Sequence, residues 1–422
     1  MADVRGFRGV RFNPGQVPDL DRVATQPYDK VSPEMKQRYL EKDEHSFVRL
    51  ILPEEYGQSD ALCREWLEQG VLKKDEKPAL YVYHEEFEAQ GAKHVRKGFI
   101  GALRVEEFEK HTVLPHERTL SKARTDRLNL LRATGRDYEQ IFLLYSDPDR
   151  EIDKVLEADG EPDITVTDEY GVIHRLWTVS DPAKLEAVRG KMQDKVLLIA
   201  DGHHRYETAL NFRRENEAAG EVPDDAALRF KSAAFVNVAD EGLVVFPTHR
   251  LLKNLGDMDW DAKTKELSGM FSLTPVEPGD AIAELERNAD GHAFVLHAGP
   301  GKTWLLKLTD RAAANRYLPE NRSDDYKRLD VTILHSVIIE GVFGIAAENI
   351  ENHVKYERDA AKAVARVDGA EFQAVVLMNP TKVEQVRVLS DKGERMPQKS
   401  TDFYPKLISG MVFLDVSDGE AI

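Results

Sequence analysis

Residues 201–205 read Asp-Gly-His-His-Arg and bring a carboxylate, a glycine and three potential cations into one short segment. Residues 196–200 before it form an apolar run typical of a strand, and the residues after it have the apolar spacing of a helix. The first backbone N–H groups of a helix lack an internal partner, and the helix dipole favours negative charge there. The segment therefore predicts a phosphate site. Its expected contacts are Gly202, where the backbone can approach a ligand closely, and the donors of His203, His204 and Arg205.

Asp201 could accept a proton or hold a metal ion at this site. The alternative is purely structural: Asp201 would cap the helix, and the two histidines would be hydrogen-bonded loop residues. The segment by itself leaves both interpretations open.

A second polar cluster stands near the end of the sequence. Lys399, Ser400, Thr401 and Lys406 lie among prolines and aromatic residues, and the prolines limit the freedom of the backbone. Hydroxyl groups and cations of this kind suit the recognition of phosphate or carboxylate. A turn that packs on the body of the protein is the structural alternative.

Residues 199–209 resemble the nucleotide-binding motif of the ParB/sulfiredoxin superfamily. Sulfiredoxins carry a catalytic cysteine where this sequence has His203, so reduction of sulfinic acids is not expected. The Asp-Gly-His-His-Arg form is similar to that of ParB-like free-serine kinases, which phosphorylate a small hydroxyl compound with a nucleotide. Four segments together resemble the signatures of the family designated domain of unknown function 1015: residues 26–29, 114–119, 201–205 and 396–401.

The resemblance implies nucleotide-dependent phosphotransfer to a small hydroxylated metabolite, serine-like or a polyol, with ATP or ADP and Mg²⁺. It places Glu117, with His116 beside it, near the acceptor hydroxyl as catalytic base, and Asp201 as the rival base and the metal ligand. It also favours phosphate-binding roles for residues 399–401 and Lys406. We expect these residues to line one cleft with residues 201–205, although an exposed turn would also explain Glu117.

Two other functions stay open. The same loop could serve a phosphoesterase or nucleotide hydrolase that uses a metal-bound water. It could also serve a non-enzymatic module that senses a nucleotide. The sequence does not indicate the acceptor, the nucleotide base or the oligomeric state.

Charge and composition limit the partners. The chain has 58 Lys and Arg against 75 Asp and Glu, a formal net charge of −17. This field repels phosphate backbones and anionic lipids, so we expect no nucleic acid or membrane partner and a phosphate site made by a local cluster of cations. The single cysteine, Cys63, excludes an intrachain disulfide and fits a reducing compartment. Residues 1–15 lack a secretory apolar region and no run of about 18 apolar residues exists, so we expect a cytoplasmic protein.

The alternation of strand and helix patterns predicts a mixed α/β (α+β) fold. The family resemblance implies a ParB/sulfiredoxin-like domain within it, at residues 99–250. N- and C-terminal α/β segments flank it at residues 1–98 and 251–422, the latter contributing a site loop. Strands are expected at residues 47–52, 79–87, 98–105, 141–145, 172–179, 196–200 and 374–378, and helices at residues 60–69, 125–134, 181–192 and 331–342.

Three connections are also predicted. Residues 230–238 and 243–247 are expected to pair around a turn, and residues 215–225 to form a mobile loop. Residues 299–303 end like a phosphate-binding P-loop, but Leu296 stands where the first glycine is needed, so we expect a hairpin there.

Overall fold

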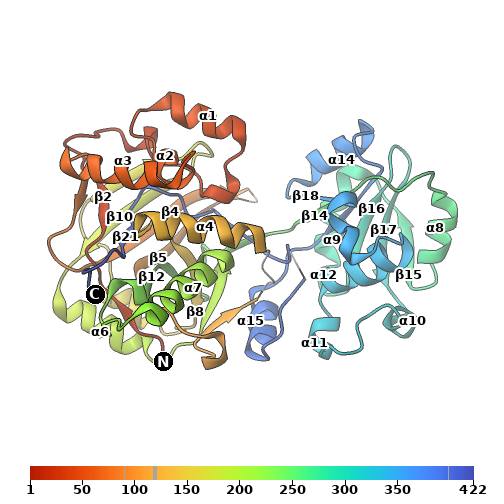
Figure 1. Cartoon of the computed structure of the whole chain (residues 1–422). Coiled ribbons are helices and arrows are strands. Elements are labelled where there is room, and N and C mark those ends of the chain that lie inside the picture. Colours follow the sequence, from red (N-terminus) through yellow and green to blue (C-terminus); the bar gives the residue numbers. More distant parts are fainter. Residues whose placement is uncertain (90, 117–120, 398) are drawn as a thin grey trace. The chain divides into compact units, whose positions relative to one another are not determined.

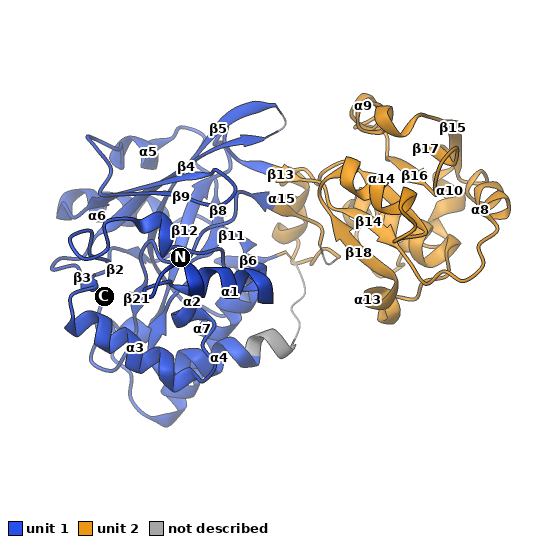
Figure 2. Cartoon of the chain, turned by 90° about the horizontal axis from the view of Figure 1, so that it is seen from above, with its two compact units in different colours: residues 1–115, 119–244, 403–422 blue, residues 116–118, 245–402 orange. Residues whose placement is uncertain are grey.

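The computed structural model describes residues 1–89, 91–116, 121–397 and 399–422. The chain forms two compact units (Figure 1), which Figure 2 shows in different colours. Unit 1 comprises residues 1–115, 119–244 and 403–422, and unit 2 comprises residues 116–118 and 245–402. This grouping differs from the three consecutive segments expected from the sequence, because the chain leaves unit 1 after Val244 and contributes to it again from Phe403 onward.

A mixed nine-stranded sheet forms the centre of unit 1 in the described residues. Its strands are β1 (Val4–Arg5), β4 (Leu80–Ala89), β5 (Ala92–Arg104), β6 (Val113–Pro115), β8 (Ile141–Tyr145), β9 (Ile164–Thr167), β10 (Ile173–Val179), β11 (Leu197–Asp201) and β12 (Phe230–Asn237). Their order is β6-β11-β8-β12-β5-β4-β10-β9, with β1 beside β5. Strand β8 runs parallel to β12 and antiparallel to β11. The mixed α/β fold expected from the sequence is confirmed.

The strands near residue 201 belong to a packed interior. Every residue of β8 and of β12 is buried. Helix α7 (His203–Ala219) contacts both strands and lies beside α4 (Ser121–Thr134), as Figure 1 shows. The core joins Tyr206 and Leu210 of α7 to Ile141 and Ile199 of the sheet. Because the first turns of α7 rest on this core, the junction between β11 and α7 has a fixed support.

Shorter elements surround the sheet of unit 1. They are β2 (Val10–Phe12), β3 (Leu72–Lys74), β7 (Arg136–Asp137), β21 (Leu414–Asp415), η1 (Leu20–Arg22), η2 (Tyr28–Lys30), α1 (Pro33–Lys42), α2 (Val48–Ile51), α3 (Tyr56–Glu68), η3 (Phe108–Lys110), α5 (Glu151–Val155), α6 (Pro182–Met192) and η4 (Ala227–Arg229). Helix α6 begins as predicted, with Pro182 in its first turn and the Asp181 side chain accepting from the Ala183 N–H. Strands β13 (Val244–Phe246) and β20 (Asp402–Tyr404) lie where the chain passes from one unit to the other.

Unit 2 contains a second sheet, ordered β15-β17-β16-β19-β14-β18. Its strands are β14 (His249–Leu252), β15 (Phe271–Pro275), β16 (Ala293–His297), β17 (Thr303–Leu308), β18 (Val354–Glu357) and β19 (Ala374–Met378). Its helices are α8 (Trp260–Leu267), η5 (Pro278–Asp280), α9 (Ala281–Arg287), α10 (Arg311–Asn315), α11 (Asp324–Lys327), α12 (Asp330–Ile333), the π-helical η6 (Leu334–Val342), η7 (Ala347–Asn349), α13 (Ile350–His353), α14 (Ala360–Asp368) and α15 (Val383–Asp391).

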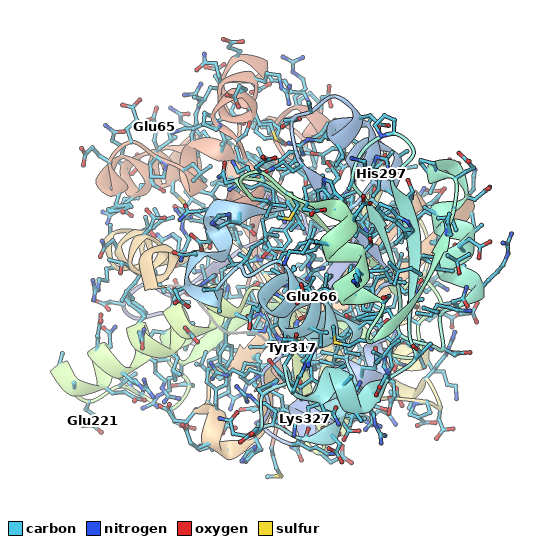
Figure 3. All side chains as sticks on the ribbon, turned by 90° about the vertical axis from the view of Figure 1, so that its right-hand side faces the viewer. Glu65, Glu221, Glu266, His297, Tyr317 and Lys327 are labelled. Carbon is cyan, nitrogen blue, oxygen red and sulfur yellow. The ribbon has the colours of Figure 1, made fainter. Side chains whose placement is uncertain are left out.

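The hairpin predicted in place of a P-loop is confirmed, because β16 and β17 are adjacent antiparallel strands. His297, labelled in Figure 3, ends β16 and is fully buried. Its ring nitrogens contact Thr303 Oγ1 at 2.8 Å and Asp368 Oδ1 at 3.1 Å. Both ring nitrogens of this histidine therefore have partners within unit 2.

Two predictions about strands are wrong: the strand assignment of residues 47–52, and the pairing of residues 230–238 with residues 243–247. Residues 47–52 contain helix α2, with Val48, Leu50 and Ile51 all buried. A short, mainly apolar run occurs in buried helices as well as in strands, so the hydrophobic periodicity of residues 47–52 could not distinguish a helix from a strand. Strand β12 does not pair with the strand that follows it but lies between β5 and β8. Burial of β12 on both faces explains this central place.

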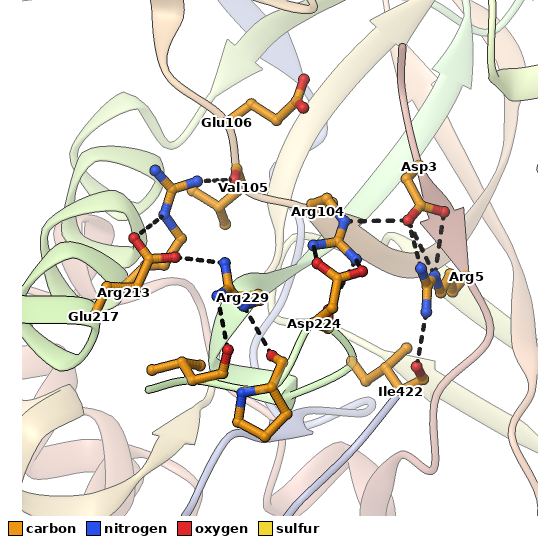
Figure 4. A network of polar contacts seen from close by, with 12 residues as sticks. Asp3, Arg5, Arg104, Val105, Glu106, Arg213, Glu217, Asp224, Arg229 and Ile422 are labelled. Atoms are coloured by element: carbon orange, nitrogen blue, oxygen red, sulfur yellow. Dashed lines mark hydrogen bonds and ion pairs between the residues drawn. The ribbon is translucent and has the colours of Figure 1, made fainter. Parts of the chain in front are cut away.

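Residues 215–225, predicted as a mobile loop, are helical as far as Ala219. Arginine side chains form hydrogen bonds with the part of this segment that follows α7 (Figure 4). Arg229 donates to the carbonyls of Val222 and Pro223, each at 2.8 Å, and Arg104 donates to the Asp224 carboxylate at 3.0 Å. The polar composition of this segment therefore reflects ion pairs and helix surface.

Candidate functional site

The junction between β11 and α7 requires a glycine. Strand β11 ends at Asp201 and α7 begins at His203, so Gly202 makes the whole connection, with φ 91° and ψ 29°. This is the left-handed region, which glycine enters without steric cost. A Cβ at Gly202 would lie 2.9 Å from Ile141 Cγ2 and 3.1 Å from Arg205 Nε. Backbone conformation and local space thus both select glycine here.

Substitution of this glycine should destabilise unit 1. Gly160 supplies a matched control, since it also has a positive φ, of 72°, but a Cβ at Gly160 would have no neighbouring atom within 4 Å. We expect Gly160→Ala to cost about 1–2 kcal/mol through its backbone alone. Gly202→Ala should cost about 1–3 kcal/mol more because of the overlap. Urea unfolding of both variants measures the difference, and equal losses would contradict it.

Helix α7 has Gly202 as its N-cap residue, and the first backbone N–H with an intrahelical partner is that of Tyr206, which donates to the Gly202 carbonyl at 3.0 Å. Asp201 precedes the N-cap residue, and the choice between a structural role and a phosphate-site role for it stays a prediction. The backbone N–H groups of the first turn and the helix dipole give this end a partial positive charge.

The Asp201 carboxylate contacts two cationic side chains. Its Oδ2 is 2.7 Å from Arg205 Nη2, and its Oδ1 is 3.4 Å from Lys406 Nζ. The Asp201 side chain is 27% exposed. Burial raises its pKa, but nearby positive charges outweigh that effect and hold the pKa well below its usual value. In order of size, these charges are those of Lys406, Arg205, Lys30 and His203.

Arg205 is buried and bonded to the protein on two sides. Its Nη1 donates to the Gln140 carbonyl, and its Nη2 donates to Asp201. Burial lowers the pKa of the guanidinium, but the Asp201 charge and other anionic groups raise it above its usual value. These contacts connect Arg205 to Asp201 and to the residue before β8, and the phosphate contact predicted for Arg205 stays a prediction.

Lys406 contacts the Asp201 carboxylate. Its place depends on the segment around it, which packs against β8 through an edge contact between Phe403 and Phe142, with ring centroids 5.6 Å apart. The Pro405 carbonyl accepts a hydrogen bond of 2.8 Å from Arg96 of β5. The cluster predicted at residues 399–406 is thus divided, since Lys406 belongs to unit 1 and residues 399–401 belong to unit 2.

The unit 2 group is also internally connected. His116 is fully buried, and its Nε2 lies 2.8 Å from Thr401 Oγ1. The Ser400 carbonyl accepts from Thr381 Oγ1 at 2.7 Å, and the Lys399 carbonyl accepts from Arg250 at 3.0 Å. The structure therefore brings His116 and residues 399–401 together. Glu117 lies outside the described residues, and a cleft shared with residues 201–205 stays a prediction.

The residue that sequence reasoning missed is Lys30, whose charge acts on Asp201. It follows directly after the Gln-Pro-Tyr-Asp segment at residues 26–29, which is one of the four family signatures. Tyr28 is fixed by its N–H, which donates to Glu139 Oε1 at 2.9 Å, and by Arg127, which lies 4.3 Å from the ring centroid. Burial raises the pKa of Tyr28 to about 12. Extending that signature by one residue would have added this lysine to the predicted site.

The cavity beside these residues is small. It has a volume of about 40 Å³, and its lining includes Arg127, Glu139 and Arg205. Ligand pockets usually measure about 300–1,000 Å³, so this cavity is too small for a nucleotide.

In residues 1–89, 91–116, 121–397 and 399–422, no group of three or more His, Cys, Asp or Glu side chains is arranged to hold a metal ion. Within the same ranges, no single helix has the length and apolar character to cross a membrane, although the bent pair Asp330–Val342 and Ala347–His353 meets both criteria when taken together.

Comparison with known proteins gave one family and several solved structures. The chain resembles a conserved hypothetical protein from Pyrococcus furiosus, with 14% identity, a TM-score of 0.35, and coverage of 72% of this chain and 92% of that one. It resembles a free serine kinase in complex with AMP at 15% identity and a TM-score of 0.35, covering 72% and 88%. For SbnI with a C-terminal truncation from Staphylococcus aureus the identity is 11% and the TM-score 0.35, covering 75% and 87%.

No curated protein matches the chain. The family model described as protein of unknown function (DUF1015) matches residues 4–332. The chain therefore belongs to the DUF1015 family.

Proposed function

We propose that the β11–α7 junction binds the phosphate groups of ATP or ADP, and that the protein transfers a phosphoryl group to a small hydroxylated metabolite, serine-like or a polyol. The observation that supports this proposal is the start of α7 directly after Gly202, next to Asp201, on which the charges of Lys406 and Lys30 act. On a chain with a net charge of −17, a local cluster of cations is what a phosphate ligand needs.

The proposed roles follow from the contacts. The backbone N–H groups of residues 203–205 and the side chains of His203 and His204 would bind phosphate oxygens, with Lys406 and Lys30 neutralising their charge. Asp201 is a poor proton acceptor, because its pKa is held low by the cations around it. We therefore assign Asp201 to orienting the cations.

The base role goes to Glu117, and the acceptor- and phosphate-binding roles predicted for His116, Lys399, Ser400 and Thr401 are kept. Magnesium is usually held by one or two carboxylates together with substrate phosphates, and Asp201 is the carboxylate present at this junction. The ion would neutralise charge on the phosphates when bound. Phosphotransfer needs little covalent chemistry from the protein, so positioned cations and one base suffice.

Nucleotide binding is the first test. We expect ATP, ADP and pyrophosphate to bind in calorimetric titrations. Lys406→Met should weaken their affinity roughly tenfold, because it removes a charge-assisted contact. Lys191→Met is the matched control, since Lys191 pairs with Glu151 at 2.7 Å in a surface contact on α6. Absence of binding at millimolar concentration, or equal losses in both variants, would contradict the proposal.

Turnover separates the three possible functions. The unchanged chain should consume ATP or ADP in the presence of Mg²⁺ only when a hydroxyl acceptor such as serine, a polyol or a sugar is supplied. Nucleotide consumption without an acceptor would favour the hydrolase. Binding without any consumption across the acceptor series would favour a nucleotide-sensing module.

A further inference from the structure

A fully buried arginine on β5 holds the backbone next to Lys406. Arg96 has no exposed surface, and its Nη2 donates to the Pro405 carbonyl at 2.8 Å. Its Nε donates to Glu85 Oε2 at 2.6 Å, and Glu85 on β4 is only 1% exposed. The guanidinium thus joins two central strands of the sheet to the residue that precedes Lys406.

The same arginine also contacts the strand beside Asp201. Its Cζ lies 4.6 Å from the centroid of the Phe142 ring, and Phe142 is the partner of Asp201 in the register of β8 and β11. Phe142 in turn packs against Phe403. Arg96 therefore connects the strand that fixes Asp201 with the segment that carries Lys406.

Beyond Glu85, buried polar groups continue to the segment that carries Lys30. Glu85 Oε1 lies 3.7 Å from His174 Nδ1, and His174 Nε2 lies 3.6 Å from Asp168 Oδ2. Gln26 Nε2 donates to Asp168 Oδ2 at 3.0 Å. We call Gln26, Asp168, His174, Glu85 and Arg96 the buried relay. Its two ends hold the two segments whose lysines act on Asp201.

Stability is a weak explanation for this relay. Burying charges is costly, and well-packed apolar residues of similar volume often stabilise a fold equally well or better. Within the described residues, Glu85 Oε1, Arg96 Nη1 and His174 Nε2 are buried and have no hydrogen-bond partner. Such incomplete pairing adds to the cost. What the relay supplies instead is fixed geometry at the Pro405 carbonyl and at Gln26.

We propose that Arg96 is a positioning residue that, through the Pro405 carbonyl, holds Lys406 against Asp201 for phosphate binding. The buried relay does the same for the segment that carries Lys30. The claim deepens the proposed function and rests on it, because Lys406 would contact the nucleotide and Arg96 would not. A positioning residue should therefore lose its effect once Lys406 is removed.

A double-mutant cycle on the full chain tests this coupling, with ADP affinity measured by calorimetry. Arg96→Lys keeps the charge but cannot donate in two directions with the fixed geometry of a guanidinium. It should weaken ADP binding about tenfold, the size expected for one charge-assisted contact. In the Lys406→Met background the same change should alter affinity less than about twofold, whereas independent effects would multiply. Multiplied effects, or an Arg96→Lys variant that binds ADP as the unchanged chain does, would overturn the proposal.

Arg104→Lys is the matched control. Arg104 lies on the same strand and pairs with Asp3 and Asp224, as Figure 4 shows. Its ADP affinity should equal that of the unchanged chain. If Arg96→Lys does not fold, Glu85→Gln replaces it in the cycle, because glutamine keeps the volume and one acceptor oxygen.

Hydrogen exchange provides a readout that needs no nucleotide. The backbone N–H groups of residues 403, 404 and 406–408 should exchange faster in Arg96→Lys than in Arg104→Lys. If the unchanged chain binds no nucleotide, the proposed function fails, and this exchange measurement then decides the positioning role alone. Equal exchange in the two variants would overturn it.

Discussion

Phosphotransfer by a Glu117→Gln variant should be about 10²–10⁴-fold slower than by the unchanged chain, because glutamine keeps size and hydrogen bonding but cannot take the proton of the acceptor hydroxyl. Nucleotide affinity should survive, since the proposed phosphate contacts lie at residues 203–205. The contacts of Asp201 strengthen this expectation. Both of its carboxylate oxygens face cations that lower its pKa, which leaves Glu117 as the better base of the two candidates.

The measurement compares turnover and nucleotide affinity on any acceptor that supports consumption of nucleotide. Glu109→Gln is a suitable control, because Glu109 is an exposed carboxylate on η3. It should leave both quantities unchanged. Full turnover in both Glu117→Gln and Asp201→Asn would show that neither carboxylate acts as the base.

Replacement of Arg205 by methionine should both weaken nucleotide binding and destabilise unit 1 by about 3 kcal/mol, because it removes one partner of a largely buried pair. The side chain is 8% exposed, and its loss leaves Asp201 and the Gln140 carbonyl without this donor. Asp201 would then face Lys406 alone at short range and shift its position. The affinity loss should therefore accompany the loss of stability.

Arg213→Met on the same helix separates a general effect on α7 from a specific one. Arg213 also donates to a carbonyl, that of Val105, and to a carboxylate, that of Glu107 at 2.8 Å. Unfolding by urea and ADP titration of both variants give the comparison. We expect Arg213→Met to lose stability while keeping its ADP affinity. An equal loss of affinity in the two variants would contradict a special role for Arg205.

The parts of this fold that the sequence predicted are those encoded by local patterns. Strand β8 is apolar at all five positions, and β19 is equally uniform, so their bounds were predicted to the residue. The start of α7 was evident from one glycine between an apolar run and a helical pattern. Residues 47–52 failed because a short apolar run fits a buried helix or a strand equally well.

Only part of the candidate site could be predicted from the sequence, because some of its residues lie far apart along the chain. Residues 201–205 are contiguous, so their strand–glycine–helix pattern could be recognised. The charge of Lys406, which lies 205 positions after Asp201 in the sequence, acts on Asp201. The charge of Lys30, which precedes Asp201 in the sequence, acts on it as well. Lys406 was included because it belongs to a cluster of hydroxyl groups and cations, and the family resemblance favoured a phosphate-binding role for that cluster over a structural one. No local pattern links Arg96 to Pro405, since that contact depends on the order of strands in the sheet.

The divided composition of unit 1 has a consequence for the order of its assembly during synthesis. The ribosome makes a chain from its N-terminus, and domains generally fold as their residues emerge. Residues 403–422 of unit 1 follow all of residues 245–402. A nascent chain that ends within unit 2 therefore has Arg205 beside Asp201 but lacks Lys406, and Gln140 lacks the Val412 carbonyl to which it donates. The proposed phosphate site would therefore gain Lys406 only after unit 2 has been synthesised, and nucleotide would stabilise only a chain whose synthesis has passed that point.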